Sequence, residues 1–297
     1  MQSSCPKCQG RKYRVERKGD LAHAITCECA KPCARCGNVG YVYAKQQATF
    51  SEREGARSYD VLVDCDCRVR DRRVRQFNDA RLPALSATAT FENFKPAKTE
   101  QARALKATQS FAHGYSAAAP SRGVVLSGPV GTGKTHLITA ALTHLLLEKG
   151  VRCAYVEISL LYATIRRGFQ EGKSGGEIIG PLTEVDVLAI DELGKGRGSQ
   201  FEMETMDELI ARRYNAGKTT LFVTNYGLLP EQKNTGSRGA PAGYRNTAAE
   251  AKGAGREPEL LRERVGERIY SRLCEMCDFV EMPLDTPDHR RARHEVR

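Results

Sequence analysis

The sequence lacks any long uninterrupted apolar run. The nearest approach is LITAALTHLLL, which His144 interrupts, whereas a membrane-spanning helix needs about 20 such residues. The first residues, MQSSCPKC, also lack the apolar stretch of a secretory signal. We therefore expect no membrane partner and a cytoplasmic protein, in which cysteine thiols stay reduced.

The overall composition is typical of a soluble globular protein. Of the 297 residues, 40% are hydrophobic and 28% are charged, a length that suits two domains. The formal net charge of +10 indicates a polyanionic partner such as a nucleic acid. In a reducing compartment the 11 cysteines favour metal binding over disulfides.

Eight of the cysteines lie near the start of the chain in four pairs, spaced CxxC, CxC, CxxC and CxC. The halves also match outside the cysteines, because CPKCQGRKYRV is similar to CARCGNVGYVY and AITCEC is similar to VLVDCDC. This pattern indicates an internal duplication that supplies four thiolates per copy. The pairs are Cys5 and Cys8, Cys27 and Cys29, Cys33 and Cys36, and Cys65 and Cys67.

Four thiolates per copy predict two structural zinc sites. A CxxC turn can present two sulfurs to one ion, and a returning strand with two more completes a tetrahedron. Sequential pairing, which we favour, gives two four-cysteine zinc ribbons within residues 1–70 and two Zn²⁺ per chain. A nested pairing, with the first and last pairs sharing a metal, is the alternative. Neither copy has enough apolar residues for a core, so bound metal should supply most of the folding energy.

A basic stretch follows the cysteines. RVRDRRVRQFNDAR, residues 68–81, contains six arginines and two aspartates. It is typical of a solvated helix or linker, which either lies along phosphates or is simply an exposed charged surface. Pro83 and the small residues after it indicate a domain boundary. We therefore predict a basic linker over residues 71–90.

A phosphate-binding motif stands between a predicted strand and a predicted helix. Residues 122–128, RGVVLSG, are typical of a strand, and the residues after 134 have helical apolar spacing up to a stop at Gly150. Between them GPVGTGKT matches GxxxxGK[ST] in the required context. Backbone N–H groups of such a loop bind a triphosphate, which side chains would block. Lys134 is expected to reach the β- and γ-phosphates, and the Thr135 hydroxyl to bind Mg²⁺.

Two acidic residues end another predicted strand. VDVLAIDEL places Asp191 and Glu192 at the carboxyl end of a buried strand, where α/β sheets bind ligands. Asp191 is expected to hold Mg²⁺, and Glu192 to act as general base for the attacking water. A further strand, residues 219–226, ends in Thr224 and Asn225. The Asn225 amide could orient that water from between the acid pair and the γ-phosphate.

Together these motifs resemble the DnaC/DnaI-type replicative helicase loaders and the related IstB transposition ATPases, both of the AAA+ class. The shared features are GTGKTHL, AIDELGKG, VTNY and GERIYSRL, with TFENFKP and a helical QARALKATQSFAH upstream. The strand CAYVEI between the two motifs also matches the AAA+ order. The resemblance implies an AAA+ ATPase domain over residues 91–297. A zinc-bearing domain ahead of it is similar to the DnaI arrangement, in which that domain docks on the helicase.

The resemblance implies roles for single residues. Glu192 and Asn225 would serve hydrolysis, and an arginine finger in GERIYSRL would face the ATP of a neighbouring subunit. Arg272 is the first choice for this finger and Arg268 the second, because a guanidinium spreads charge over the γ-phosphate oxygens. A finger that acts in trans requires an ATP-dependent oligomer. The implied nucleotide-binding residues are Gly128, Pro129, Val130, Gly131, Thr132, Gly133, Lys134, Thr135, His136 and Asp191.

The segment SLLYATIRRGFQEGKSGG falls where such loaders carry an extra helix facing single-stranded DNA. Its charged and aromatic residues could combine phosphate contacts with base stacking, although a core helix with a solvated arginine edge has the same pattern. The candidate DNA-binding residues are Tyr162, Arg166, Arg167 and Phe169.

Two segments depart from the family pattern. Residues 230–258 form a Gly-, Ala- and Arg-rich stretch that is too long for this family and predicts a flexible insertion. The tail PDHRRARHEVR is too short for the helical lid of many AAA+ proteins. Cys274 and Cys277 have no second pair nearby, so we expect packed thiols.

These inferences combine into one expected architecture. We predict tandem zinc ribbons followed by an α/β AAA+ P-loop core without a C-terminal lid. The expected function is ATP-dependent loading of a hexameric replicative DNA helicase onto single-stranded DNA. The alternatives are an IstB-like transposition regulator that acts on target DNA and a zinc-dependent co-chaperone without a DNA role.

Overall fold

The computed structural model describes residues 5–49, 56–119, 121–228, 260–283, 285–286 and 288. The predicted insertion at 230–258 and the tail after residue 288 lie outside these described residues. The chain divides into two units, the first comprising Met1–Thr88 with Leu145–Gly150 and the second Ala89–His144 with Val151–Arg297. No helix in the described ranges is long and apolar enough to cross a membrane.

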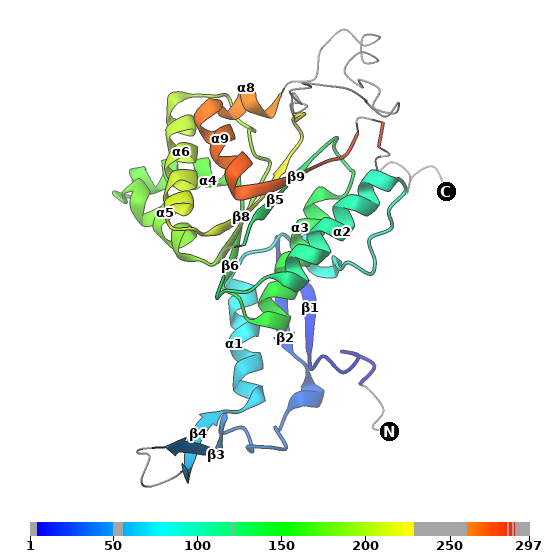
Figure 1. Cartoon of the computed structure of the whole chain (residues 1–297), viewed down its shortest axis with the longest axis vertical. Coiled ribbons are helices and arrows are strands. Elements are labelled where there is room, and N and C mark those ends of the chain that lie inside the picture. The colour runs from blue at the N-terminus through cyan, green and yellow to red at the C-terminus, as the bar shows by residue number, and fades with distance from the viewer. Residues whose placement is uncertain are drawn as a thin grey trace. The chain divides into compact units, whose positions relative to one another are not determined.

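A five-stranded parallel sheet forms the centre of the second unit (Figure 1), which confirms the predicted α/β class. Its strand order is β6-β7-β8-β5-β9. Every residue of β5, β7 and β8 is buried, as expected for parallel strands covered by helices on both faces. The bounds are β5 (Gly123–Ser127), β6 (Cys153–Glu157), β7 (Val187–Asp191), β8 (Thr219–Thr224) and β9 (Cys277–Glu281).

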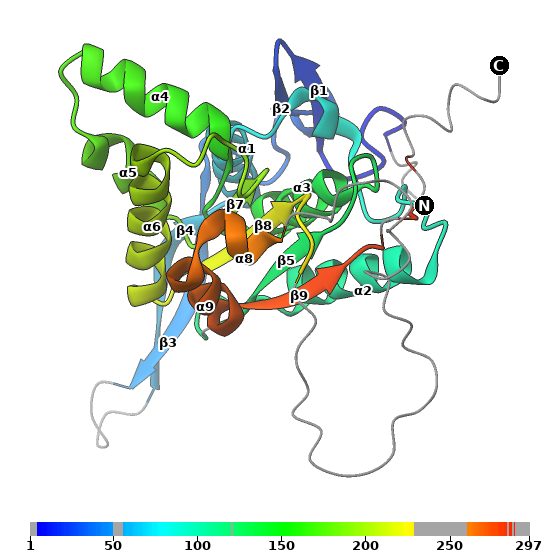
Figure 2. The ribbon, with the colours of Figure 1, turned by 90° about the horizontal axis from the view of Figure 1, so that it is seen from above.

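Helices cover both faces of this sheet (Figure 2). Helices α2 and α3 pack together on one face, and α4, α5, α6 and α9 lie on the other. The core on the second face joins residues of all four of these helices to β5, β7 and β8. The bounds are α2 (Thr99–Gly114), α3 (Lys134–His144), α4 (Ile158–Gln170), α5 (Gly175–Glu184), α6 (Gln200–Asn215), α8 (Leu261–Val265) and α9 (Glu267–Met276). In the described residues after β9 no helix follows.

The order of the strands explains how the sequence motifs meet. Strand β8 lies between β5, which leads into the glycine-rich loop, and β7, which ends in the acid pair. Because all the strands are parallel, Ser127, Asp191 and Thr224 end their strands at the same edge of the sheet. Residues spread over about a third of the chain are thereby placed side by side.

The first unit contains two antiparallel hairpins, one for each copy of the cysteine repeat. In each copy the CxxC pair precedes the hairpin and the CxC pair follows it. The bounds are β1 (Tyr13–Lys18), β2 (Leu21–Thr26), η1 (Glu28–Ala30), β3 (Tyr41–Thr49), β4 (Ala56–Asp64), α1 (Asp66–Asp79), η2 (Ala84–Thr88) and the π-helical η3 (Leu145–Lys149). Gly150, the predicted helix stop, has φ +72° directly after η3.

The basic stretch forms α1, and this helix packs against β2. Val74 and Phe77 are buried on its apolar side. Asn78 donates to the carbonyl of Ala24 at 3.1 Å and accepts from its N–H at 2.7 Å. The first hairpin is therefore packed by a helix that contributes apolar residues from outside both cysteine copies. The second hairpin instead leaves Tyr43 and Leu62 exposed.

A fully buried arginine joins α6 to the beginning of β8. Arg213 donates from Nε to the Thr220 hydroxyl at 2.9 Å and from Nη1 to the Leu182 and Val185 carbonyls at 2.7 and 3.0 Å. Burial lowers its pKa to about 10, so it remains charged at neutral pH. It thereby satisfies carbonyls at the end of α5 that have no helical partner.

We predict that Arg213→Ala lowers the free energy of unfolding by about 2–4 kcal/mol, because it leaves buried carbonyls unpaired and opens a cavity. Arg212→Ala is the matched control, since Arg212 makes an ion pair with Glu208 at the surface. It should cost less than about 1 kcal/mol. Urea unfolding of the zinc-replete chain measures both changes, and equal stability of the two variants would contradict this role for Arg213.

Candidate functional site

The glycine-rich loop connects β5 to α3 with three residues at positive φ. These are Gly128 at +142°, Gly131 at +81° and Gly133 at +94°. A Cβ on Gly128 would lie 2.6 Å from the Met282 carbonyl, and one on Gly133 would lie 2.5 Å from the ring of Phe94. The absence of side chains is therefore required by packing inside the protein as well as by the approach of a phosphate.

Lys134 begins α3 and folds back over the loop. Its ammonium group donates to the carbonyls of Gly128 and Pro129, both at 2.7 Å, and its side chain is almost fully buried. These neutral acceptors hold a buried cation at the centre of the loop. The loop N–H groups and this charge together can bind an anion of the size of a phosphate.

Thr135 and Asp191 meet across the carboxyl edge of the sheet. The Thr135 hydroxyl donates to Oδ2 of Asp191 at 2.8 Å. Adjacent oxygen ligands of an octahedral Mg²⁺, each at about 2.1 Å from the ion, are about 3.0 Å apart. The two oxygens predicted to hold Mg²⁺ thus have a separation that fits this ion.

Asp191 is held in place by three hydrogen bonds. Oδ2 also accepts from the Tyr155 hydroxyl at 2.7 Å, and Oδ1 accepts from the Glu192 N–H at 2.8 Å. Burial raises the pKa of Asp191, and the bonds from Tyr155, Thr135 and Glu192 oppose that rise. Tyr155 is a site residue that sequence analysis missed, and its aromatic ring within the strand CAYVEI was the only signal for it.

Glu192 directly follows β7 with φ +59°, in the left-handed region that a glutamate rarely adopts. Its Oε2 lies 3.4 Å from the Asn225 amide nitrogen and 3.4 Å from the Lys195 ammonium. Lys195 also contacts Glu157 at 3.1 Å. The structure therefore brings Glu192 and Asn225 together beside the glycine-rich loop, as sequence analysis predicts, and adds Lys195.

His136 contacts the segment before α2. Its Nε2 lies 2.8 Å from the Thr90 carbonyl, and its ring packs against Phe94 at a centroid distance of 5.5 Å. The carbonyl can only accept, so Nε2 carries the proton. His136 thus fixes the segment that packs on Gly133, whereas sequence analysis placed it among the nucleotide contacts.

The two candidate finger arginines lie on α9 and share one carboxylate. Arg272 makes a short ion pair with Asp207 of α6, and Arg268 contacts the other oxygen of Asp207 at 3.5 Å. The Arg268 side chain is 77% exposed and that of Arg272 is 24% exposed. Arg268 is thus the more accessible to a neighbouring subunit.

The predicted DNA-binding residues all lie on α4 but differ in exposure. Tyr162 is only 4% exposed and belongs to the apolar core, which corrects the expectation that its ring is available for stacking. Arg166 makes an ion pair with Glu202 at 3.1 Å and lies over the ring of Phe201. Arg167 and Phe169 are exposed.

The eight N-terminal thiols form two clusters in sequence order, as the sequential pairing predicts. Within each cluster all the sulfurs lie within 4.8 Å of one another, and the closest pairs are 3.4–4.0 Å apart. Four sulfurs at about 2.3 Å from a tetrahedral Zn²⁺ would be about 3.8 Å apart. The clusters, which fit this ion, are Cys5, Cys8, Cys27 and Cys29, and Cys33, Cys36, Cys65 and Cys67.

Backbone N–H groups favour the thiolate at some of these cysteines, whereas the bond with Cys8 raises the pKa of Cys29 and burial raises that of Cys67. The pKa of Cys33 is lowered to about 6, chiefly by the N–H groups of Cys36 and Arg35. The sulfur of Cys36 also accepts from the Gly40 N–H at 3.2 Å. Thiolates are the form that binds zinc.

The same ion pair occurs in both copies of the repeat. Lys7, inside the first CxxC, contacts Glu28, inside the first CxC, at 2.9 Å. Arg35 and Asp66 make the equivalent contact in the second copy at 3.1 Å. The duplication read from the sequence thus extends to side-chain contacts.

The remaining CxxC pair is divided between core and surface. Cys277 is buried and its thiol lies 3.3 Å from the Thr220 carbonyl, as predicted for a packed thiol. Cys274 is exposed, which corrects that expectation for this residue.

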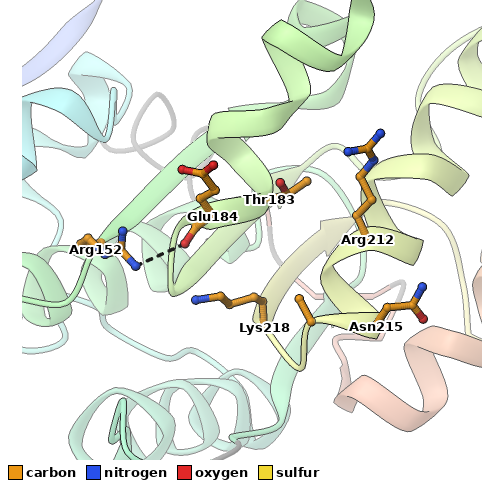
Figure 3. Close-up of a pocket in the computed structure, with 7 residues that line it drawn as sticks. Arg152, Thr183, Glu184, Arg212, Asn215 and Lys218 are labelled. Carbon is orange, nitrogen blue, oxygen red and sulfur yellow. Dashed lines mark hydrogen bonds between the residues drawn. The ribbon is translucent and has the colours of Figure 1, made fainter.

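A shallow pocket of about 780 Å³ lies away from these side chains (Figure 3). Arg152 and Lys218, on its wall, both make ion pairs with Asp186 at 3.0 Å, and Arg152 also donates to the Glu184 carbonyl. These residues precede β6, β7 and β8, so the pocket lies at the amino ends of the strands. Ligands of parallel sheets bind at the opposite, carboxyl edge. We therefore expect nucleotide at the glycine-rich loop on that edge and not in this pocket.

Comparison with known proteins identifies similar chains. The sequence profile described as IstB-like ATP binding protein matches residues 41–230. The replicative helicase loader DnaC of Escherichia coli K12 is 27% identical over 165 residues, which are 55% of this chain and 66% of DnaC. DnaC of Buchnera aphidicola subsp. Acyrthosiphon pisum is 28% identical over 143 residues, which are 48% of this chain and 57% of that protein. The matches thus span less than two thirds of these relatives.

A solved structure shows the same fold. The crystal structure of the DnaC helicase loader matches with a TM-score of 0.52 and 26% sequence identity. The match covers 67% of this chain and 98% of that chain. The parallel sheet with its P-loop is therefore an AAA+ core, as sequence analysis predicts.

We predict that Lys134→Ala weakens binding of a fluorescent ATP analogue by roughly 100-fold, about 2.7 kcal/mol, because the loop loses its buried cation. Lys173→Ala is the matched control, since Lys173 is exposed and pairs with Glu171. It should leave the affinity unchanged. Unaltered binding by Lys134→Ala would reject the loop as the nucleotide site.

We predict about two zinc ions per chain, one for each four-thiolate cluster. Replacing Cys8 and Cys29 together by serine should remove one ion, because both belong to the first cluster. Replacing Cys29 and Cys33 together should remove both ions. The nested pairing gives the reverse result for the two double variants, so metal analysis of the purified full chains separates the pairings.

Proposed function

The chain belongs to the family of IstB-like ATP binding proteins, and from this premise we propose that it is an ATP-dependent loader of a hexameric replicative DNA helicase onto single-stranded DNA. The observation that carries the proposal is the similarity to the crystal structure of the DnaC helicase loader, which covers 67% of this chain and 98% of the chain in that structure. The geometry of the nucleotide site also supports the proposal, because it supplies groups that could bind and hydrolyse ATP.

The carboxyl edge of the sheet provides the groups for ATP hydrolysis. The loop amides and Lys134 would bind the phosphates, and Thr135 with Asp191 would hold Mg²⁺. The metal, when bound, neutralises charge on the β- and γ-phosphate oxygens. Glu192 would take a proton from the attacking water, and Asn225, 3.4 Å from Glu192, would orient that water.

Hydrolysis would be completed by a neighbouring subunit. Arg268 and Arg272 contact Asp207 of α6 in their own chain. From α9 one of them would reach the γ-phosphate of the next chain, where a guanidinium stabilises the developing charge. This arrangement makes the oligomer the active form and ATP the switch that assembles it.

Two further surfaces would bind the other partners. On α4, the exposed Arg167 and Phe169 would contact a phosphate and a base of single-stranded DNA. The zinc-stabilised part of the first unit would dock on the helicase, and its zinc ions would be structural because protein fills all four positions. Residues 1–70 as the docking domain and 71–90 as a linker remain predictions.

The direct test uses the full chain, zinc-replete, with the replicative helicase of the same cell. Closed single-stranded DNA circles are suitable, because they have no free end and a closed helicase ring can encircle them only if the ring opens. We expect the chain and ATP together to increase the helicase recovered on the circles. A chain that binds duplex DNA and leaves helicase recovery unchanged would instead favour a transposition regulator, and one that binds neither DNA nor helicase would favour a co-chaperone.

In that assay we predict that Glu192→Gln retains ATP and lowers its turnover about 10²–10⁴-fold, because the general base is lost. Loader, helicase and circle should then remain associated, since release follows hydrolysis. Glu204→Gln is the matched control, because Glu204 is an exposed residue of α6. Normal turnover by Glu192→Gln would remove Glu192 from the mechanism.

A further inference from the structure

Arg264 of α8 contacts the loops that follow two neighbouring strands of the sheet. Its Nε and Nη2 donate to the Gly194 carbonyl at 3.1 and 2.9 Å, and Nη2 also donates to the Gly196 carbonyl at 2.7 Å. Its guanidinium carbon lies 5.2 Å from the centre of the Tyr226 ring. Gly194 lies two residues after Glu192, and Tyr226 directly follows Asn225. One side chain thus contacts the backbone that follows Glu192 and the ring of the residue that follows Asn225.

The loop after Glu192 is also fixed from its other side. Oε2 of Glu202 accepts from the N–H groups of Arg197 at 2.9 Å, Gly198 at 3.0 Å and Ser199 at 3.3 Å. Glu202 is 6% exposed. The loop therefore gives its N–H groups to a glutamate of α6 and its carbonyls to an arginine of α8. The sequence signal for Glu202 was the capping pattern Ser-x-x-Glu at residues 199–202.

The contact with Gly194 is close because this residue is a glycine. Gly194 has φ +87°, and a Cβ there would lie 2.9 Å from the Tyr226 ring and 3.2 Å from Cβ of Arg264. The neighbouring Leu193 is bonded to β8, since its N–H donates to the Val223 carbonyl at 2.8 Å. Movement of Arg264 would therefore displace the residues that follow β7 and β8.

Helix α8 leads directly into the helix that carries the finger candidates. Leu261 and Val265 anchor α8 in the core, and the Leu261 N–H donates to the Gly227 carbonyl at 2.9 Å, just after β8 (Figure 1). Gly266, with φ +78°, is the single residue between α8 and α9. Arg264 therefore contacts the loop after Glu192 and lies three residues before the start of α9, the helix that carries Arg268 and Arg272.

We propose that Arg264 is a positioning residue that fixes Glu192 and Asn225 relative to the finger-bearing helix α9. It acts through the carbonyls of Gly194 and Gly196 and through the ring of Tyr226. The proposal rests on the ATPase function proposed above. The planar guanidinium of Arg264 is required, because a lysine ammonium cannot bind two carbonyls and stack on a ring in the same way.

Steady-state hydrolysis by the full chain tests this role. We expect Arg264→Ala and Arg264→Lys each to lower kcat at least tenfold, with the KM for ATP changed less than about twofold, because the phosphate contacts are intact. Arg262→Ala is the matched control on the same helix, because Arg262 makes an exposed ion pair with Glu267. Either Arg264 variant with kcat within twofold of the native value, or an equal loss in Arg262→Ala, would overturn the proposal.

Hydrogen exchange tests the contact without hydrolysis, so failure of the ATPase function and failure of this proposal are distinguishable. In the nucleotide-free chain, Arg264→Ala should accelerate exchange about tenfold or more at the amides of residues 193–199. Exchange in the buried strand β5 of the same unit should not change, which also shows that this unit of the variant is folded. Unchanged exchange at residues 193–199 would refute the coupling even if the native chain hydrolyses no ATP.

Mixed assemblies separate positioning from a finger. A variant that lacks its finger should regain activity when mixed with Lys134→Ala chains, which still supply Arg268 and Arg272. Arg264→Ala should not regain activity in this mixture, because it damages the site of its own chain. Recovery of Arg264→Ala to the level of the finger variant would assign Arg264 to the neighbouring site and overturn the proposal.

Discussion

A hydrogen bond of 2.8 Å between Thr135 and Asp191 connects the beginning of α3 to the end of β7, although β8 lies between β5 and β7. The contact requires the three strands to end at one level, which the parallel register provides. The other groups of the site are arranged around it. The Tyr155 hydroxyl donates to the same carboxylate oxygen, and Asn225 directly follows the strand in between, β8.

The motifs that sequence analysis could locate are those in which chemistry and chain direction are local. A glycine-rich loop between a β-branched strand and an amphipathic helix defines its own position, and so do two acids at the end of a buried strand. The sequence placed the strand CAYVEI, which is β6, between the two motifs along the chain, but it did not predict the order of the strands in the sheet. Thr135, Asp191, Glu192 and Asn225 were accordingly predicted together, and the structure places them at one edge of the sheet.

The residues that sequence analysis missed depend on distant partners. Tyr155 reaches Asp191 only because β6 and β7 pair in register, and Arg264 reaches Gly194 only because α8 packs behind β8. The opposite error occurred at Tyr162. An aromatic residue beside arginines is compatible with a DNA surface, but on an amphipathic helix its ring lies on the apolar side, which faces the core.

The cysteine repeat shows how two copies of one pattern can diverge in their packing. Spacing alone predicted the thiol clusters, and the structure groups them in sequence order. Burial could not be predicted, because it depends on α1, which covers the first hairpin with Phe77 and holds Ala24 through Asn78. Tyr43 and Leu62 lie opposite each other on the second hairpin and remain exposed.

Two arginines of α9 share one carboxylate of α6. Asp207 has two cationic neighbours, Arg268 and Arg272, one on each of its oxygens. If one of them turns outward to an anion, the other still neutralises the carboxylate. The carboxylate thus keeps a cationic partner when one arginine turns away, and because these side chains are partly exposed, the electrostatic cost of that movement is small. If only one arginine were paired with Asp207, its departure would leave the carboxylate without a cationic partner.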